Sequence, residues 1–226
     1  MPEYYLDKTK LYVAVDCIIL GFSENTLKIL IGKRKLSPGE GEYTLNGVFV
    51  RANESLDEAA ERALYELTGI RKLSLRQVGA FGTVDRDPVA RVISVAYCAL
   101  INVKDYYKES LLSKYQLQWV DVYNMPTLFS DHNKIVEEAL NQLRRDINKE
   151  PISFNLLPKL FTLTQLQHVY EAILGHEIDK RNFRKKIKQM DFLEKTDLID
   201  KTTSKRGAAL YRFNETNYFH GAKFKL

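Results

Sequence analysis

Residues 180–188, KRNFRKKIK, hold six cationic side chains and no acidic one. In a helix, four of these cations share one exposed face: Arg181, Arg184, Lys185 and Lys188. The apolar side chains of the same stretch then turn toward a neighbouring element: Phe183, Ile187 and Met190. Such a face fits the major groove of DNA, where arginine reads guanine and lysine holds phosphates. We predict that Arg181 and Arg184 read guanine, that Asn182 reads adenine if it faces the groove, and that the lysines, Lys180 included, hold phosphates.

Two neighbouring segments suit the same partner. A polar, basic loop is typical of a wing that contacts the DNA backbone or enters the minor groove: Thr202, Thr203, Ser204, Lys205 and Arg206. Gln165 and Gln167, at the start of the preceding predicted helix, are candidate phosphate contacts. The alternative for a run of charge is a solvated helix face. The apolar stripe, the capped partner helix and the basic loop together favour the DNA-binding interpretation.

A second chemical pattern lies in residues 45–70. Counted back from Gly69-Ile70, four residues match a Nudix box, the metal-binding motif of enzymes that hydrolyse nucleoside diphosphate derivatives: Glu54, Arg62, Leu64 and Glu66. The segment therefore resembles a Nudix box. It departs from that pattern at three positions, with Val48 in place of a glycine and with Ala63 and Leu67 in place of glutamates.

These departures bear on catalysis. A Nudix hydrolase holds divalent metal on glutamates that share one helix face, and Mg²⁺ needs several hard oxygen ligands. Only Glu66 remains here, so we predict a domain without catalytic residues, metal or cofactor. Glu66 is then expected to pair with Arg62, four residues earlier on the same face.

The resemblance continues beyond the box, in residues 77–82, 85–88 with Arg91, 95–100 and 130–132. Together with the C-terminal third, these segments resemble the Nudix-related transcriptional regulators of the NrtR-like family, in which a Nudix-type domain is fused to a winged helix. The resemblance implies a homodimeric repressor or activator that binds double-stranded operator DNA. It also implies that the Nudix-type domain senses a small-molecule effector.

Some members of the family respond to ADP-ribose and related NAD metabolites, and another branch responds to pentoses. The chain is most similar to the arabinose-responsive (AraR-type) branch, which implies a repressor of genes for the use of L-arabinose. Three alternatives stay open: a regulator that senses ADP-ribose, a Nudix hydrolase with a basic appendage for substrate or RNA, and a metal-independent binding module without a DNA role.

Seven residues are candidates for effector binding: Asp16, Lys33, Arg34, Tyr43, Arg86, Asp87 and Arg91. A diphosphate requires several cations or free helix N–H groups, whereas a sugar requires planar hydrogen-bond partners and an aromatic face. The missing metal ligands favour a sugar. Asp16 interrupts an apolar strand, so it must either face a cavity or find a buried partner such as an arginine.

The elements that position these residues follow from periodicity. Strands are predicted over 11–20, 26–34, 43–45, 74–82, 91–103 and 118–122, with turns at 21–25 and 46–47. Ser55-x-x-Glu58 is a capping box that begins a helix, Gly69 ends that helix, and 131–148 is a second amphipathic helix. Further on, Thr164-x-x-Gln167 and Asp179 begin two helices, Gly175 ends the first of them, and 196–213 predicts two short strands around a loop.

The charge is divided unevenly. Of the 34 Lys and Arg and the 29 Asp and Glu residues, 20 and 21 lie in residues 1–150, and 14 and 8 in residues 151–226. We therefore predict an α+β chain of two domains. Residues 1–150 form an effector-sensing Nudix-type α/β/α sandwich with a mixed sheet, and residues 151–226 form a winged helix-turn-helix that meets a polyanion.

Several classes of protein are disfavoured. No apolar run approaches membrane-helix length, and the first residues do not form a signal segment, so we expect a cytoplasmic protein without a membrane partner. Cys17 and Cys98 lie in apolar runs and are expected to be buried, reduced thiols. The histidines lack metal-site spacing, and His132 is expected to be a helix-start residue with ordinary polar partners.

Overall fold

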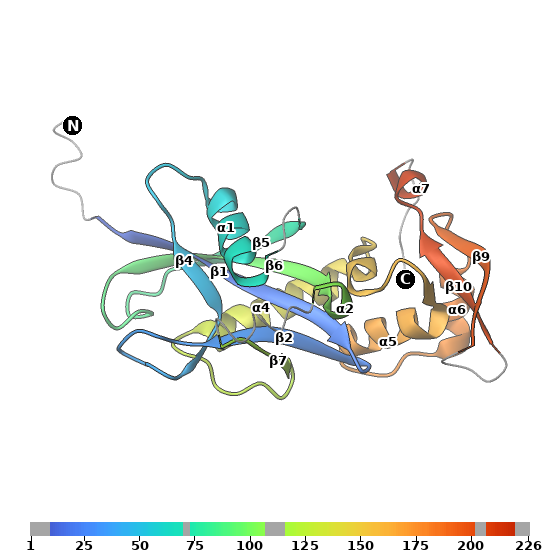
Figure 1. The fold of residues 1–226 in the computed structure, drawn as a ribbon, viewed down its shortest axis with the longest axis horizontal. Coiled ribbons are helices and arrows are strands. Elements are labelled where there is room, and N and C mark those ends of the chain that lie inside the picture. The colour runs from blue at the N-terminus through green and yellow to red at the C-terminus, as the bar shows by residue number, and fades with distance from the viewer. Residues whose placement is uncertain (1–9, 70–72, 107–115, 202–206, 220–226) are drawn as a thin grey trace.

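The computed structural model describes residues 10–69, 73–106, 116–201 and 207–219. Within these residues the first part of the chain forms a seven-stranded sheet in the order β3–β2–β1–β6–β5, to which β4 is added through β1 and β7 through β2 (Figure 1). The strands are β1 (Tyr12–Ser23), β2 (Thr26–Lys33), β3 (Tyr43–Thr44), β4 (Asn46–Phe49), β5 (Leu75–Phe81), β6 (Val92–Asn102) and β7 (Gln118–Asp121). β1 and β6 are parallel and the other pairs are antiparallel, so the sheet is mixed.

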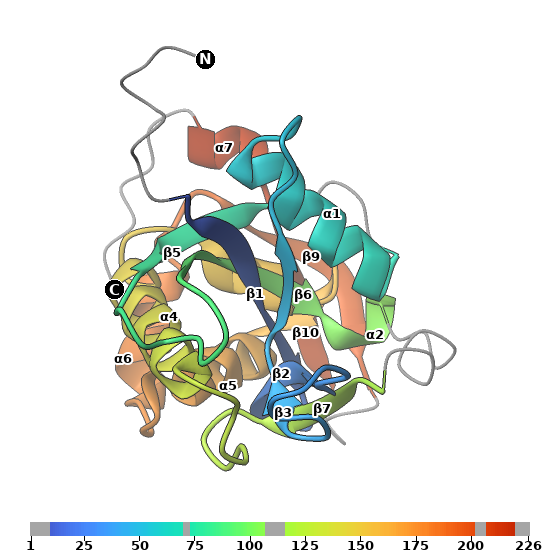
Figure 2. The same cartoon turned by 90° about the vertical axis from the view of Figure 1, so that its left-hand side faces the viewer.

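Helices cover both faces of this sheet (Figure 2). α1 (Leu56–Thr68) packs on one face against Val15, Cys17 and Ile19, and α4 (His132–Asp146) packs on the other against Ile18 and Leu20. Successive strand residues point to opposite faces, so Asp16 lies on the α4 side. α2 (Val103–Tyr106) is a short helix after β6. The predicted α/β/α sandwich with a mixed sheet is confirmed.

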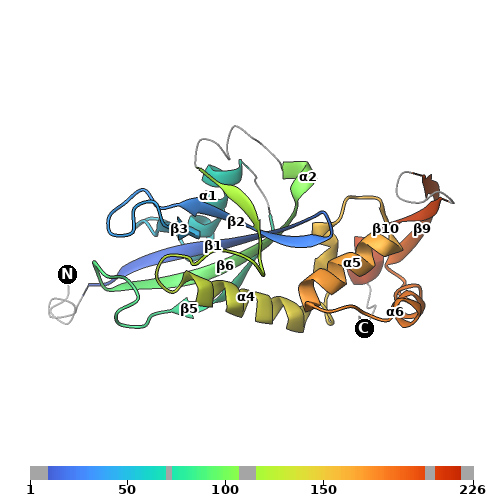
Figure 3. The same cartoon turned by 90° about the horizontal axis from the view of Figure 1, so that it is seen from below.

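The C-terminal part has the element order of a winged helix (Figure 3). It comprises η2 (Ile152–Leu156), β8 (Phe161–Thr162), α5 (Leu163–Leu174), α6 (Lys180–Ile187), β9 (Leu193–Asp200), β10 (Ala208–Phe213) and α7 (Glu215–Phe219). The strands pair in the order β8–β10–β9. Asp179 caps α6 by accepting the N–H of Asn182, and Phe183 and Ile187 are buried against the rest of the module. The predicted winged helix-turn-helix is confirmed, with β8 as a strand that the sequence analysis missed.

Four local predictions need correction. Asn46-Gly47 is not a turn but the start of β4, where glycine is needed because a Cβ would overlap Asp16 Oδ1. The turn before β2 is only Glu24-Asn25, both with positive φ. The capping box of α5 is Thr162 with Gln165, because Thr162 ends β8 in an extended conformation. Cys17 is buried, whereas Cys98 is partly exposed; both are free.

One apolar cluster joins the two parts of the chain. It runs from the α4 face of the sheet through Ile147 and Phe154 to Val169 and Phe183. The predicted boundary at residue 150 therefore stays a prediction. No helix in the described part of the chain is long and apolar enough to cross a lipid bilayer.

Candidate functional site

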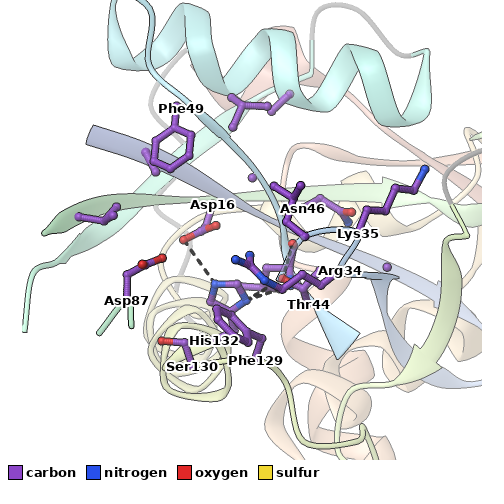
Figure 4. A pocket seen from close by; sticks show the side chains of 18 of the residues that line it. Asp16, Arg34, Lys35, Thr44, Asn46, Phe49, Asp87, Phe129, Ser130 and His132 are labelled. Carbon is purple, nitrogen blue, oxygen red and sulfur yellow. Dashed lines mark hydrogen bonds and ion pairs between the residues drawn. The ribbon is translucent and has the colours of Figure 1, made fainter. Parts of the chain in front are cut away.

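A cavity of about 470 Å³ opens between the ends of β1, β2 and β4, the loop before β6 and the start of α4. Five of the predicted effector residues line it: Asp16, Lys33, Arg34, Arg86 and Asp87. The remaining lining is mostly apolar, with Phe49 and Phe129 among it, and α1 contributes Ala63 and Glu66. Figure 4 shows Asp16 and His132 pointing toward each other in this pocket.

The acidic floor of the pocket is held by polar neighbours. Asp16 is buried and accepts a hydrogen bond of 2.5 Å from Ser94 Oγ on β6. Arg86 Nη2 lies 3.5 Å from the same carboxylate oxygen, Asp16 Oδ2. The Arg86 guanidinium also donates two hydrogen bonds, of 3.0 and 2.8 Å, to Asp131 at the start of α4. Asp16 thus both faces a cavity and has an arginine partner. The sequence left these two possibilities open as alternatives, and both are present in the structure.

His132 completes this network. Its Nδ1 accepts the backbone N–H of Leu45 at 3.1 Å, which leaves the proton of the neutral ring on Nε2, 3.9 Å from Asp16 Oδ2. Burial lowers the pKa of His132, and the nearby Arg86 guanidinium also lowers it, while the Asp16 carboxylate opposes both. The sequence predicts no role for His132 beyond the helix start, whereas in the structure His132 is part of the pocket wall.

The rim of the pocket is cationic. Arg34 stacks on Phe129, with 4.1 Å from guanidinium carbon to ring centroid, and its Nε donates to the carbonyl of Pro38. Lys33 Nζ lies 3.4 Å from the centroid of the Tyr43 ring. Tyr43 itself does not line the cavity, so its predicted role as an effector contact changes to that of a support for Lys33.

The loop before β6 is fixed by its own polar side chains. Arg91 does not line the cavity, because its guanidinium donates to the carbonyls of Gly82 and Thr83. Asp87 accepts the N–H groups of Val89 and Ala90. Arg91 is therefore corrected from a predicted effector contact to a residue that shapes the loop that carries Arg86.

The glutamates of the Nudix-type segment are used structurally. Glu54 accepts two hydrogen bonds from Arg62, which holds the pKa of Glu54 down at about 2, and Arg62 also donates to the carbonyl of Phe49. Glu66 lies 3.6 Å from Arg62, the pairing expected from the sequence. Ala63 is fully buried beside it. In the described part of the chain no three His, Cys, Asp or Glu residues are grouped to hold a metal ion.

The cations of α6 form two stripes. Arg181 and Lys185 line only the outer surface, together with Asp179. Lys180, Arg184 and Lys188 line both that surface and a cleft beside α5. Arg184 shares the outer surface with Arg181, Lys185 and Lys188, as the helical spacing predicts, and its Nη2 also donates to Thr164 Oγ1 on α5 at 2.9 Å.

The other predicted DNA contacts fall into four groups. Gln165 lines the cleft and caps α5 by accepting the N–H of Thr162. Gln167 is buried and donates to Glu171, so its side chain points into the protein; this overturns its prediction as a phosphate contact. Asn182 lies near the start of α6. The predicted wing contacts lie outside the described residues: Thr202, Thr203, Ser204, Lys205 and Arg206.

The sequence predicted no role for Phe129 or His132 as members of the pocket wall, nor for Ser94 and Asp131, which do not line the cavity but hydrogen-bond to Asp16 and Arg86. Ser94 offered a signal, because it is a polar residue inside a buried strand, as Asp16 is. Asp131 offered none, because an aspartate before a helix is typical of an N-cap, and only the structure shows that its side chain does not cap α4. Its carboxylate binds Arg86 instead.

Three comparisons with known proteins agree with this architecture. Residues 153–213 match the family model described as the NrtR DNA-binding winged helix domain. The ADPR responsive transcriptional repressor NtrR of Acinetobacter baylyi is 35% identical over 210 residues, which cover 91% of this chain and 83% of that protein. The ADP-ribose pyrophosphatase of Methanocaldococcus jannaschii is 32% identical over 135 residues, which cover 60% of this chain and 79% of that enzyme.

Among solved structures, Shewanella oneidensis NrtR complexed with a 27mer DNA matches with a TM-score of 0.81 and 28% identity. The match covers 94% of this chain and 97% of that one, so it includes both the sheet with its pocket and the winged helix.

Proposed function

The chain belongs to the NrtR family of Nudix-associated winged-helix regulators, and from this premise we propose that it is a DNA-binding transcriptional repressor controlled by ADP-ribose or a closely related diphosphate. One observation carries the proposal. α6 carries outward cations, Arg181 and Lys185, that have no ion pair within the described residues, and it is attached through a continuous apolar core to a Nudix-type pocket that keeps its cations but lacks the glutamate trio.

The pocket supports a diphosphate better than a neutral sugar. Lys33 and Arg34 stand at its rim, where two cations can pair with phosphate oxygens that an uncharged pentose lacks, while Arg86 at its floor is already neutralised by Asp16 and Asp131. Phe49 and Phe129 offer aromatic surfaces for an adenine or a ribose. None of the similar proteins named above is described as arabinose-responsive, and two of them carry ADP-ribose in their names. We therefore prefer ADP-ribose to the L-arabinose that the sequence resemblance favoured.

The same pocket supports binding without hydrolysis. Its α1 wall presents Ala63 and a single glutamate, Glu66, whose side chain is 46% exposed and paired with Arg62. A lone, partly solvated carboxylate is a weak Mg²⁺ site, and cleavage of a diphosphate by this fold needs the metal. We propose that the domain has become a receptor.

On the DNA side, Arg181 and Lys185 are proposed as the outward contacts of α6, with Asn182 near its start. As a homodimer, the protein would place two α6 helices against two half-sites. Effector binding would change their spacing, so that they no longer match one face of the DNA.

The test uses the full-length protein and a DNA site selected from a randomised duplex library. Fluorescence anisotropy measures DNA binding with ADP-ribose or L-arabinose added, and chromatography measures ADP-ribose breakdown with Mg²⁺. We expect ADP-ribose to weaken DNA binding, L-arabinose to leave it unchanged, and no breakdown to occur. Rapid Mg²⁺-dependent cleavage, or release by L-arabinose alone, would refute the corresponding part of the proposal.

A further inference from the structure

The turn that joins β1 and β2 extends beyond the sheet toward the winged helix. Glu24 and Asn25 form this turn with φ values of 53° and 58°, and Ser23 pairs with Thr26. Asn25 Oδ1 lies 2.9 Å from His168 Nδ1 on α5, across 143 residues of sequence. The tip of the hairpin therefore contacts the DNA-binding module directly (Figure 1).

Asn25 and His168 line a cleft of about 670 Å³. Its other walls are the first turn of α5, the base of β10, and the inner stripe of α6 with Lys180, Arg184 and Lys188. None of the described residues that line the cleft is acidic. Three cations and a histidine thus surround a space to which the described part of the chain brings no neutralising carboxylate, which is the electrostatic setting of an anion site.

Two groups in the cleft have unused hydrogen-bonding capacity. Arg184 Nε is shielded from solvent and has no partner in the described part of the chain, although its Nη2 is held by Thr164. When His168 Nδ1–H donates to Asn25 Oδ1, the amide N–H groups of Asn25 stay available for an acceptor. Both groups donate, so the acceptor they fit is an oxygen-rich anion.

We propose that this cleft seats a phosphate of the DNA backbone and that Asn25, a residue of the sensor domain, is one of its contacts. This inference rests on the proposed DNA-binding function. The inner stripe of α6 shares Lys180, Arg184 and Lys188 with the outer surface, so DNA placed along α6 brings its backbone to the mouth of the cleft. The sensor domain then contacts the operator itself as well as the module that reads it.

The principal variant is Asn25→Asp, which keeps the size of the side chain and tolerates positive φ but adds a negative charge. We expect DNA affinity to fall about tenfold or more, with a larger loss at low salt. Asn53→Asp is the matched control, because Asn53 is an exposed asparagine in the loop before α1, remote from the cleft. We expect it to change DNA affinity by less than about twofold, since an isolated surface charge is screened.

A second pair of variants separates a hydrogen bond from a charge. Asn25→Gly removes the amide and keeps the left-handed conformation, so it should weaken binding without changing the salt dependence. Lys188→Ala removes a cation, so the slope of log affinity against log salt should fall by about 0.9. ADP-ribose affinity, measured on every variant, should stay at the wild-type value. The melting temperature of Asn25→Asp should also stay there, because the aspartate keeps the acceptor for His168, whereas Asn25→Gly loses that acceptor and should melt slightly lower.

The outcomes are distinguishable. Wild-type DNA affinity in Asn25→Asp, or an equal loss in Asn25→Asp and Asn53→Asp, overturns the inference, and the proposed function then stands if Arg181→Ala still weakens DNA binding. A loss of DNA affinity in Asn25→Asp that tracks a loss of melting temperature also overturns it, because the turn then only supports α5. If the wild-type protein binds no DNA, the proposed function itself fails.

Discussion

The pocket and the outer face of α6 both gather cations, but they arrange them in opposite ways. In the pocket Arg86 is almost fully buried between Asp16 and Asp131, and Arg34 is fixed on an aromatic ring. On α6, Arg181 and Lys185 make no hydrogen bond or ion pair within the described residues, and both are exposed. One region has its charges positioned before any ligand arrives, and the other leaves them free.

This difference teaches what each region can select. Buried, mutually bonded charges hold one geometry, so they discriminate between ligands by shape and are costly to disturb. Free charges on a surface attract any polyanion over about a Debye length, tolerate loss of one member, and weaken with salt. Ligand selection in the pocket therefore depends on the tertiary contacts that hold its charged side chains, whereas attraction of DNA to the outer face of α6 depends little on such contacts.

The largest effect is expected at Arg86. Arg86→Ala leaves the carboxylates of Asp16 and Asp131 buried without their cation, so the free energy of unfolding should fall by about 3–5 kcal/mol. Urea denaturation measures it. Arg212→Ala is the matched control, because Arg212 is paired with Glu194 at the surface and its loss should cost less than about 1 kcal/mol. An equal loss of unfolding free energy in the two variants would show that the buried ion pairs of Arg86 contribute no more than an exposed one.

In contrast to Arg86→Ala, Arg181→Ala should lower DNA affinity and leave the stability of the fold almost unchanged. The loss of one base or phosphate contact should weaken DNA binding by about 1–3 kcal/mol, since Arg181 lies on the outer stripe of α6. Its free energy of unfolding should stay within about 0.5 kcal/mol of the wild-type value, because no partner is lost. Anisotropy titrations and urea denaturation measure the two quantities. Unchanged DNA affinity would show that the outer stripe does not face DNA.

The sequence predicted those parts that depend on local pattern. Apolar and β-branched runs bounded by turn residues gave the long strands, and capping residues such as Ser55, Gly69 and Asp179 gave the helix ends, because these signals act over a few residues. The outward stripe of α6 also follows from helical spacing. The hydrogen bond from Arg184 to α5 does not, because it depends on Thr164 in another helix.

The pocket needed contacts between distant segments. Asp16 was recognisable as an acid in an apolar strand, but its partners Ser94, Arg86 and His132 come from three other places in the chain. Tyr43 and Arg91 had suitable chemistry and the wrong position, since both support neighbouring residues from outside the cavity. The types of residue in the sequence predicted a charged ligand pocket, but tertiary packing determined which of these residues line it.

An intermediate effect is expected from the titration of His132. Its pKa is lowered in the folded protein by burial, so below about pH 6.5 the unfolded chain binds a proton that the folded chain resists. The free energy of unfolding should therefore fall as the pH drops from 7 to 5, by at most about 1.4 kcal/mol per pH unit for one proton. Chemical denaturation at several pH values measures this slope.

The control is His132→Asn, whose side-chain oxygen can still accept the N–H of Leu45 but does not titrate. The difference in slope between the two proteins isolates His132 from other histidines. Glu54 does not interfere: its pKa is about 2, so its stabilising contribution is present above about pH 4.5 and is lost only below that value. Identical slopes in both proteins would mean that protonation of His132 costs the folded state nothing.

The smallest effect is expected where the two regions meet. Tyr123 Oη lies 2.7 and 3.0 Å from the carbonyls of Ala172 and Ile173, at the end of α5, and Arg144 Nε at the end of α4 donates to the carbonyl of Ile173. α4 begins in the pocket at His132, so these bonds connect the pocket to the winged helix.

Tyr123→Phe should lower the free energy of unfolding by about 0.5–1.5 kcal/mol, the usual net value of one hydrogen bond. Because effector and DNA influence each other only through structures that both sites bias, the variant should also reduce the change in DNA affinity that ADP-ribose causes, while each ligand alone binds as before. Tyr12→Phe, at the exposed start of β1, is the control. If ADP-ribose changes the DNA affinity of Tyr123→Phe as much as that of the wild type, this junction only holds the modules together. The coupling between the pocket and the cations of α6 then depends on other contacts.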